Sequence, residues 1–419
     1  LLGRIGNLED AENVVAQAAN MIAQGEVEPN RIGKTVLVID EAQDMSADEY
    51  ALVSSLMTAN EEMRVIAVGD DDQNIYEFRG SNSRHMQMLT NVESSRFVEM
   101  TDNYRSARHI VNASNAFVRH IHNRLKKTPI NSMSSEDGWI SISHHSSVFM
   151  YEPLIAELIR NRNNISQEQK QGRTTCILTQ TNDEASILVA LLQKHNINSK
   201  LVQSMDGFRF LNLAEMRYFF KHIANQNNSP LISDELWESA KQMTYKLYSN
   251  SDSLVYVKNC ITKFETTNKI KYYSDFKEYV FESSIEDFGD YSDSDVIVST
   301  IHKSKGHEFD DVYMLVNGGY TKDDELMRRY YVAITRAKKR LFIHTNTNIF
   351  DNIAVDAKYI DSKQYDTPEE IVIQMSHKDV NLGFFKNRKN EVLSLRGGSS
   401  LSYSDHYFYD SNNKCVAKL

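Results

Sequence analysis

The sequence predicts an α/β protein in which helices flank parallel sheets. Val36–Ile39 is a short apolar run rich in β-branched residues, a pattern typical of a strand buried on both faces. Between residues 139 and 195 strand and helix patterns alternate, as expected for parallel strands joined by crossover helices. Carboxylates follow two of the early strands directly, and open parallel sheets bind ligands at the carboxyl ends of their strands.

Before residue 100 the pattern predicts two helices and three strands. Residues 1–35 contain an amphipathic helix followed by a loop. Ser46-x-x-Glu49 is a capping box that opens a second helix. Strands are expected at Val36–Ile39, Arg64–Val68 and Phe97–Met100.

The middle of the chain is expected to hold a second parallel sheet. A helix should open near Asp102–Ser106 and run to about Phe117. The following run at 119–127, RHIHNRLKK, is expected to be a basic helix end, either a solvated face or a contact to a phosphate backbone. The remaining expected elements are strands at Trp139–Ser143 and Thr174–Thr179 and helices at Pro153–Arg160 and Glu184–His195.

Beyond residue 200 the chain should leave this sheet and return to it. Residues 224–293 are rich in Ser, Asn, Lys and Tyr, with helical patterning near 233–248 and 271–282. The returning strands are expected at Val296–Ser299, Val312–Val316 and Leu341–His344. The tail sequence LSLRGGSSLSYSDHYFYD predicts a small β-hairpin or barrel.

Composition describes an ordinary globular protein of two to three domains. The chain has 419 residues, 41% hydrophobic and 25% charged, and no apolar run approaches the ~20 residues of a membrane span. Its net charge is −10, so contact with nucleic acid would depend on local basic patches. Three scattered cysteines suggest neither zinc nor disulfides and fit the reducing cytoplasm. A first residue that is Leu and not Met suggests a piece of a larger protein.

Polar side chains should meet at one edge of the first sheet. Asp40 and Glu41 follow the first strand, and Asp70, Asp71, Asp72 and Gln73 follow the second. This is the layout of a nucleotide-hydrolysing site, where one acid holds Mg²⁺ and another prepares a water. Gly33-Lys34-Thr35 has the ending of a P-loop, but the first glycine of that motif is absent and a strand follows where a helix is required. We therefore do not interpret it as a phosphate-binding loop.

Five segments, in this order, resemble the motifs of UvrD/Rep/PcrA-type superfamily 1 DNA helicases. They are DEAQD from Asp40, GDDDQNIYEFRG from Gly69, NYRS from Asn103, TIHKSKGHEF from Thr300 and YVAITRA from Tyr331. His307 departs from the apolar residue usual in the fourth of these segments, and Phe78 stands where the family generally has Trp. The resemblance covers roughly residues 36–345 and implies RecA-like parallel sheets.

The resemblance also implies a role for each matching residue. Asp40 would bind Mg²⁺, Glu41 would activate the attacking water, and Gln73 would sense the γ-phosphate of ATP. Arg105 and Arg336 match the family's two arginine fingers. The alternative is that each arginine only pairs with a carboxylate at the edge of a sheet. The cofactor-binding residues would be Tyr104, which stacks on adenine, Glu308, which binds the ribose, and Gly306 beside it.

The expected DNA contacts lie within the segments that begin at Gly69 and Thr300. Tyr76 and Phe78 would stack on bases, although a core position for Phe78 is the alternative. Contacts to the DNA backbone are expected from Arg79, Thr300, His302 and Lys303. A structural role is the alternative for His302.

The sequence therefore predicts the C-terminal portion of an ATP-dependent DNA helicase that moves 3′→5′ on single-stranded or junction DNA. A P-loop segment upstream in the same parent protein would complete the site, so we expect this chain alone to be inactive. A paralogue without a P-loop that serves as a nucleic-acid-binding or scaffold subunit is the alternative. The expected domains are a partial RecA-like domain (1–100), a complete one (101–223 and 294–350), a shortened inserted subdomain (224–293) and a small β-rich C-terminal domain (351–419).

Overall fold

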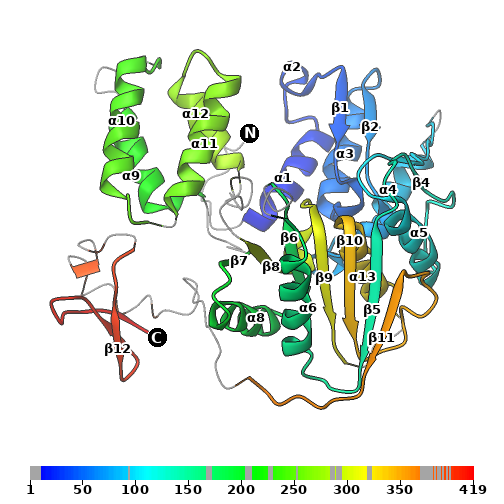
Figure 1. Cartoon of the computed structure of the whole chain (residues 1–419). Coiled ribbons are helices and arrows are strands. Elements are labelled where there is room, and N and C mark those ends of the chain that lie inside the picture. Colours follow the sequence, from blue (N-terminus) through cyan, green and yellow to red (C-terminus); the bar gives the residue numbers. More distant parts are fainter. Residues whose placement is uncertain are drawn as a thin grey trace. The chain divides into compact units, whose positions relative to one another are not determined.

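A computed structural model of the chain divides into two compact units. One unit comprises Leu1–Val202 with Val296–Glu370, and the other comprises Gln203–Asp295 with Ile371–Leu419. Figure 1 shows the elements of both. The structure describes residues 11–92, 95–166, 172–202, 210–224, 230–251, 253–283, 288, 295–318, 323–368, 381, 384, 388, 391–392, 395 and 398–419.

The first part of the larger unit is a two-stranded parallel sheet with four helices. Strand β1 (Val36–Ile39) pairs with β2 (Arg64–Ala67). The helices are α1 (Ala11–Ala23), α2 (Pro29–Ile32), α3 (Ala47–Ala59) and α4 (Ser83–Thr90). Helix α3 begins with the predicted capping box, in which the Ser46 hydroxyl accepts from Glu49 N and the Glu49 carboxylate accepts from Ser46 N at 2.8 Å.

Two expectations for this part of the unit are wrong: the burial of β1 and the strand at residues 97–100. Strand β1 is not buried on both faces, because Val36 and Val38 are 47% and 63% exposed. The small core of Ile22, Val27 and Ile32 packs against Leu52 and Leu56 of α3 and includes no residue of β1. Residues 97–100 form no strand, since no described strand lies beside them to pair with, and Met100 is 76% exposed.

The second part of this unit is a seven-stranded parallel sheet with the order β11-β5-β10-β9-β6-β8-β7. Every residue of the inner strands β6, β8 and β9 is buried, as expected for strands covered on both faces. The strands are β5 (Trp139–His145), β6 (Thr175–Thr179), β7 (Ser199–Leu201), β8 (Val296–Thr300), β9 (Phe309–Val316), β10 (Ala337–Thr345) and β11 (Ala357–Asp361).

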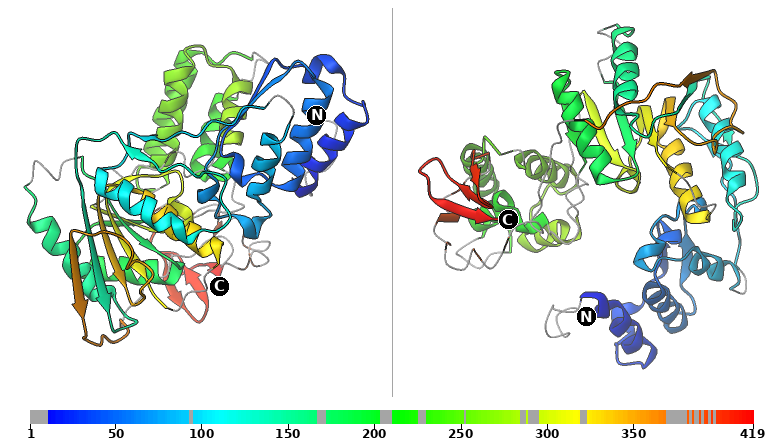
Figure 2. Two further views of the ribbon diagram at one scale, coloured as in Figure 1. Left: turned by 90° about the vertical axis from the view of Figure 1, so that its right-hand side faces the viewer. Right: turned by 90° about the horizontal axis from the view of Figure 1, so that it is seen from below.

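Helices cover both faces of this sheet. Helices α6 (Tyr151–Asn163) and α8 (Asn182–Lys194) lie on one face, and α5 (Arg108–Phe117) and α13 (Asp324–Thr335) lie on the other (Figure 2). After α5 the chain forms one 3₁₀ turn, η4 (Val118–His120), and then a loop. The expected basic helix end at 119–127 is therefore wrong. The loop side chains and amides are instead used in contacts described below. The short strands β3 (Asp102–Asn103) and β4 (Asn131–Ser132) pair in parallel, and β4 contacts α5.

The smaller unit holds four described helices and a three-stranded antiparallel sheet. Helices α9 (Ala214–Ile223), α10 (Asp234–Leu247), α11 (Leu254–Thr267) and α12 (Tyr273–Glu282) bury Trp237 and several phenylalanines. Because α9 shares this core, the unit begins about twenty residues before the boundary expected at 224. The tail strands are β12 (Ser402–Ser404), β13 (Tyr407–Tyr409) and β14 (Cys415–Lys418), while β11 joins the large sheet. Among the described helices, none has the length and apolar character to span a membrane.

Candidate active site

The end of β1 carries two acidic residues in a tightly turned backbone. Glu41 has φ 50° and ψ 41°, the left-handed region, which costs a non-glycine residue roughly 1–2 kcal/mol. Asp40 Oδ1 accepts a hydrogen bond from Glu41 N at 2.9 Å, and both acids are exposed. The turn continues as the 3₁₀ helix η1 (Ala42–Asp44). It leaves the Asp40 and Glu41 carboxylates facing solvent at the strand end.

Gln43 connects the ends of the two strands. Its buried side chain donates to Glu41 Oε2 and accepts from Asp70 N at 3.0 Å. A Cβ atom at Gly69 would overlap Gln43 Oε1, so this close approach requires glycine two residues after the end of β2. The contacts bring Asp40–Glu41 and Asp70 to the same edge, as the sequence predicts.

Gln73 and Arg336 meet within the larger unit. Gln73 Nε2 donates to Asp70 Oδ2 at 2.8 Å, and Gln73 Oε1 accepts from Arg336 Nη2 at 2.9 Å. Arg336 follows the last residue of α13 and is only 2% exposed. Burial and then the charge of Arg105 lower the pKa of Arg336 to about 10, so the guanidinium is still protonated at neutral pH.

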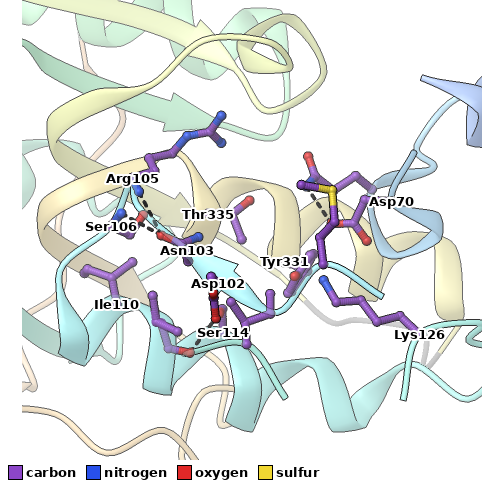
Figure 3. Close-up of a pocket in the computed structure, with 14 residues that line it drawn as sticks. Asp70, Asp102, Asn103, Arg105, Ser106, Ile110, Ser114, Lys126, Tyr331 and Thr335 are labelled. Atoms are coloured by element: carbon purple, nitrogen blue, oxygen red, sulfur yellow. Dashed lines mark hydrogen bonds between the residues drawn. The ribbon is translucent and has the colours of Figure 1, made fainter. Parts of the chain in front are cut away.

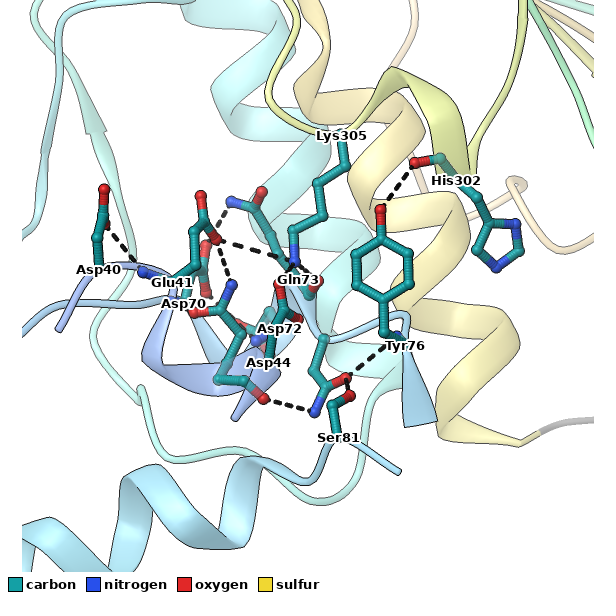
Figure 4. A network of polar contacts seen from close by, with 12 residues as sticks. Asp40, Glu41, Asp44, Asp70, Asp72, Gln73, Tyr76, Ser81, His302 and Lys305 are labelled. Atoms are coloured by element: carbon teal, nitrogen blue, oxygen red, sulfur yellow. Dashed lines mark hydrogen bonds and ion pairs between the residues drawn. The ribbon is translucent and has the colours of Figure 1, made fainter. Parts of the chain in front are cut away.

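Lys305 is a site residue that the sequence reasoning did not select. Its ammonium group pairs with the Asp44 carboxylate, donates to Gln73 O at 3.1 Å and lies 3.8 Å from Glu41 Oε2 (Figure 4). Burial raises the pKa of Asp44, and the Lys305 hydrogen bond opposes that effect. The available signal was the position of Lys305 inside the TIHKSKGHEF motif.

A second group of predicted residues lies at the start of α5. Arg105 forms an ion pair with Glu308, and its amide donates to Asn103 Oδ1 at 3.0 Å. Arg105, Gln73 and Tyr331 line a cavity of about 150 Å³ (Figure 3). Tyr104 is 78% exposed.

Gly306 lies in the left-handed region of the backbone, with φ +82°. A Cβ atom added there would meet no other atom within 4 Å. Glycine is therefore favoured at this position by the backbone conformation and not by a close neighbour.

Three rings form an aromatic group on the surface of the larger unit. Phe78 is 62% exposed, so it is not a core residue. Its ring meets His302 edge-on at 5.6 Å and lies 6.2 Å from Tyr76. Tyr76 Oη donates to His302 O at 3.3 Å. The structure thus brings the segments that begin at Gly69 and Thr300 together at these rings.

The other predicted DNA contacts are distributed around this group. Thr300 ends β8 and is buried, with 6% exposure. Lys303 Nζ donates to Asn182 Oδ1 at 2.8 Å. Arg79 lies in the 3₁₀ helix η3 (Glu77–Arg79), and its side chain is outside the described part of the chain.

The acidic run after β2 is used within the protein. Asp70, Asp71 and Asp72 have carboxylate oxygens within 4.8 Å of one another, but each accepts a protein hydrogen bond. Arg124 holds Asp72 through two bonds, at 2.7 and 2.6 Å, and Leu125 N donates to Asp71 at 2.6 Å. Burial raises the pKa of Asp72 to about 6, against the effect of Arg124. Of the acids in this region, exposed Asp40 is the better candidate for a metal.

Comparisons with known proteins identify the family of this chain. The sequence model of the UvrD/REP helicase N-terminal domain matches residues 7–93, and that of the UvrD-like helicase C-terminal domain matches 98–283 and 231–348. The ATP-dependent DNA helicase PcrA of Staphylococcus epidermidis is 27% identical over 194 residues, 45% of this chain and 25% of that protein.

Two further relatives extend the comparison. DNA helicase II of Escherichia coli is 26% identical over 200 residues, 46% of this chain and 26% of that protein. Gabija protein GajB of Bacillus cereus is 23% identical over 326 residues, 73% of this chain and 63% of that protein. The chain thus spans about a quarter of the length of the helicases PcrA and DNA helicase II. With the two domain models together matching most of residues 7–348, the chain belongs to the UvrD-like helicase family.

Proposed function

We propose that this chain is the C-terminal portion of an ATP-dependent DNA helicase that couples ATP hydrolysis to movement on single-stranded or junction DNA. The observation that carries the proposal is the buried charge of Arg336. Its hydrogen bonds to described residues go to neutral acceptors: Val332 O, His307 O, Gln73 Oε1 and Thr335 Oγ1.

A buried guanidinium is normally matched by a carboxylate. Among the described residues, none places a carboxylate within 4.0 Å of Arg336. The site therefore retains attraction for an anion that comes from outside. Arg105, which is paired with Glu308, lies near enough for its charge to lower the pKa of Arg336. Phosphoryl transfer spreads negative charge over three oxygens, which two such arginines can stabilise.

The remaining polar residues fit the other needs of the same reaction. Asp40 offers an exposed carboxylate oxygen, the ligand type that Mg²⁺ prefers while it keeps several waters. Magnesium, when bound, would neutralise phosphate charge. Glu41 would orient or deprotonate the attacking water, and Gln73, which already bridges Asp70 and Arg336, would respond to the γ-phosphate. Tyr104 and Glu308 are proposed for adenine and ribose, with Gly306 beside them.

The exposed aromatic group is proposed as the DNA-stacking surface. Tyr76 and Phe78 present rings beside His302, and stacking on such rings tolerates any base sequence. Arg79, Thr300 and Lys303 are proposed for the DNA backbone. The 3′→5′ direction is proposed from the family resemblance alone.

The open apolar face of the first sheet is an argument that a further segment of the same RecA-like domain covers it. Val36, Val38 and Ile66 are about half exposed or more on that face, and GKT at 33–35 lies between α2 and a strand, where it cannot act as a P-loop. We propose that a P-loop segment of the parent protein covers this face.

The proposed domains keep the expected bounds. Residues 1–100 belong to the first RecA-like domain, and 101–223 with 294–350 form the second. The remaining parts, 224–293 and 351–419, would be the inserted subdomain and the C-terminal domain.

The test is Arg336→Ala in the complete parent protein. Turnover of ATP should fall about 1,000-fold or more, while nucleotide affinity changes far less, because the charge that Arg336 stabilises is greatest in the transition state. Arg160→Ala, at an exposed position of α6, is the matched control and should keep normal turnover. Near-normal turnover by the Arg336 variant, with Arg105→Ala equally active, would contradict the proposal.

A further inference from the structure

The loop at residues 121–125, here called the Arg124 loop, joins two elements that carry the candidate site. On one side it contacts the 3₁₀ helix η2 (Asp71–Gln73). Arg124 Nε and Nη2 donate to the two oxygens of Asp72 at 2.7 and 2.6 Å, and Leu125 N donates to Asp71 Oδ2 at 2.6 Å. Asp72 has no exposed surface, so Arg124 is what compensates its buried charge.

On the other side the same loop contacts the first half of α13. Asp324 accepts from the amides of His122 and Asn123 at 3.0 and 2.9 Å. These bonds, together with the His122 ring, outweigh burial and lower the pKa of Asp324 to about 2. Arg328, one turn further along α13, donates to Asn123 O at 2.9 Å. The loop is therefore fixed at both sides by charge-assisted hydrogen bonds.

Arg328 also ties α13 directly to the GDDDQNIYEFRG segment. Its second terminal nitrogen donates to Glu77 Oε1 at 3.0 Å, and only 5% of its side chain is exposed. Helix α13 thus lies against η2 both directly and through the Arg124 loop, and it contacts η3 through its own arginine.

The two contacts of the Arg124 loop lead to the same hydrogen bond. Asp72 directly precedes Gln73, and α13 ends at Thr335, directly before Arg336. The 12 residues of α13 span about 18 Å, so this one helix runs from the Arg124 loop to Arg336. A shift of η2 relative to the start of α13 would therefore change the 2.9 Å bond between Gln73 and Arg336.

We propose that Arg124 is a positioning residue for ATP hydrolysis, which holds η2 against α13 so that Gln73 faces Arg336. This inference rests on the proposed function. Arg124 acts through Asp72 and need not touch the nucleotide. The run that contains it, RHIHNRLKK, offers a solvated or DNA-binding face as alternatives, but the guanidinium of Arg124 is occupied by Asp72, a pairing that requires the planar geometry of arginine.

The first measurement uses the 419-residue chain and does not depend on ATP. In Arg124→Met with Asp72→Leu, no buried charge is left unpaired, so the fold should be retained. Hydrogen–deuterium exchange should then rise at least about fivefold in both η2 and the first turns of α13, with the melting temperature within a few degrees of wild type. Arg160→Met is the matched control and should change neither segment. Unchanged exchange in the double variant would overturn the proposal.

The second measurement places the same variants in the parent protein. A positioning role predicts that kcat falls tenfold or more, while KM for ATP and affinity for single-stranded DNA stay within about threefold. Arg124→Lys keeps the charge without the planar guanidinium and should recover only part of kcat. A purely structural role predicts normal kcat in every variant that keeps the wild-type melting temperature, and that result would overturn the inference.

The two proposals can fail separately. If Arg336→Ala abolishes turnover while the Arg124 variants keep it, the proposed function stands and the positioning role fails. If the wild-type parent shows no turnover at all, the proposed function fails and takes the catalytic role of Arg124 with it. The exchange measurement then still decides whether the Arg124 loop holds η2 against α13.

Discussion

A buried pair of histidines predicts that the larger unit loses stability in mild acid. His145 and His344 lie near the ends of neighbouring strands β5 and β10, and both are buried, at 7% and 1% exposure. His145 Nε2 lies 3.0 Å from His344 Nδ1, and His145 Nδ1 lies 3.2 Å from Asp361 Oδ2. His344 Nε2 lies 2.9 Å from Glu157 Oε2.

These contacts indicate which ring nitrogens of the two histidines carry hydrogen atoms. A neutral His145 donates from Nδ1 to Asp361 and accepts from His344, whose second nitrogen faces the Glu157 carboxylate. Burial, followed by the neighbouring His344, lowers the pKa of His145 to about 4, against about 6.5 in the unfolded chain. Above pH 6.5 neither state binds this proton, so stability is complete there. Between pH 6.5 and 4 only the unfolded state takes the proton, and folding stability is lost.

The size of the effect follows from that difference. About 2.5 pH units correspond to about 3 kcal/mol of unfolding free energy at pH 4. The chain has two tryptophans, Trp139 in β5 and Trp237 in the smaller unit. In a Trp237→Phe background, Trp139 fluorescence reports urea unfolding of the sheet that contains His145.

The comparison is between wild-type His145 and His145→Gln, measured at pH 7.5 and 4.5 at constant ionic strength. Gln can still donate to Asp361 and accept from His344, but it does not titrate. The wild type should lose about 2–3 kcal/mol more between the two pH values than the variant. All other titrating groups are the same in the two proteins. Equal losses would therefore show that protonation of His145 does not reduce the stability.

The remaining predictions concern the proposed nucleotide and DNA sites and the close contact at Gly69. The isolated 419-residue chain should release no appreciable phosphate from ATP, with or without single-stranded DNA, and robust DNA-stimulated release would contradict this. Phe78→Ala in the parent should weaken single-strand binding by about 1–3 kcal/mol at an unchanged salt slope, whereas Lys303→Ala should lower that slope by about one; the opposite pattern would reverse their roles. Gly69→Ala should lower the unfolding free energy of the chain by about 1–3 kcal/mol, because its Cβ would displace the buried Gln43 side chain; an unchanged melting temperature would show that Gln43 is not held in place.

Local signals explain most of what the sequence predicted about the fold. The capping box at Ser46–Glu49 is formed as expected, because both partners lie within one helical turn. The burial of β1 could not be predicted in the same way. An apolar run shows that a strand prefers cover, but whether Val36 and Val38 receive cover depends on other parts of a fold. The prediction of a strand at 97–100 failed for the same reason, since a strand requires a partner as well as a propensity.

For the candidate site, too, some contacts could be predicted from the sequence and others could not. Motif order was enough to expect that Gln73 and Arg336 belong together, and their side chains meet. The partners of Lys305 and Arg124 could not be inferred. Asp44 is 261 residues away from Lys305, and Asp72 is 52 away from Arg124. Nothing in a basic run distinguishes a lysine or arginine that faces solvent from one that compensates a buried acid.

Burial together with pairing distinguishes Arg336 from Arg124, Arg173 and Arg340. Arg173 and Arg340 both hold buried Asp311 through paired bonds of 2.6 to 2.8 Å, which satisfies that acid within the sheet. Arg124 is likewise paired with one buried acid. Arg336 is more deeply buried than these, yet its hydrogen bonds to described residues go to neutral oxygens. A buried arginine whose charge is already matched gains little from a phosphate, whereas one held in place without a described counter-ion is arranged in advance for an anion. Arg336 is therefore the arginine of this group expected to act in hydrolysis, and Arg124 is expected to hold it in position.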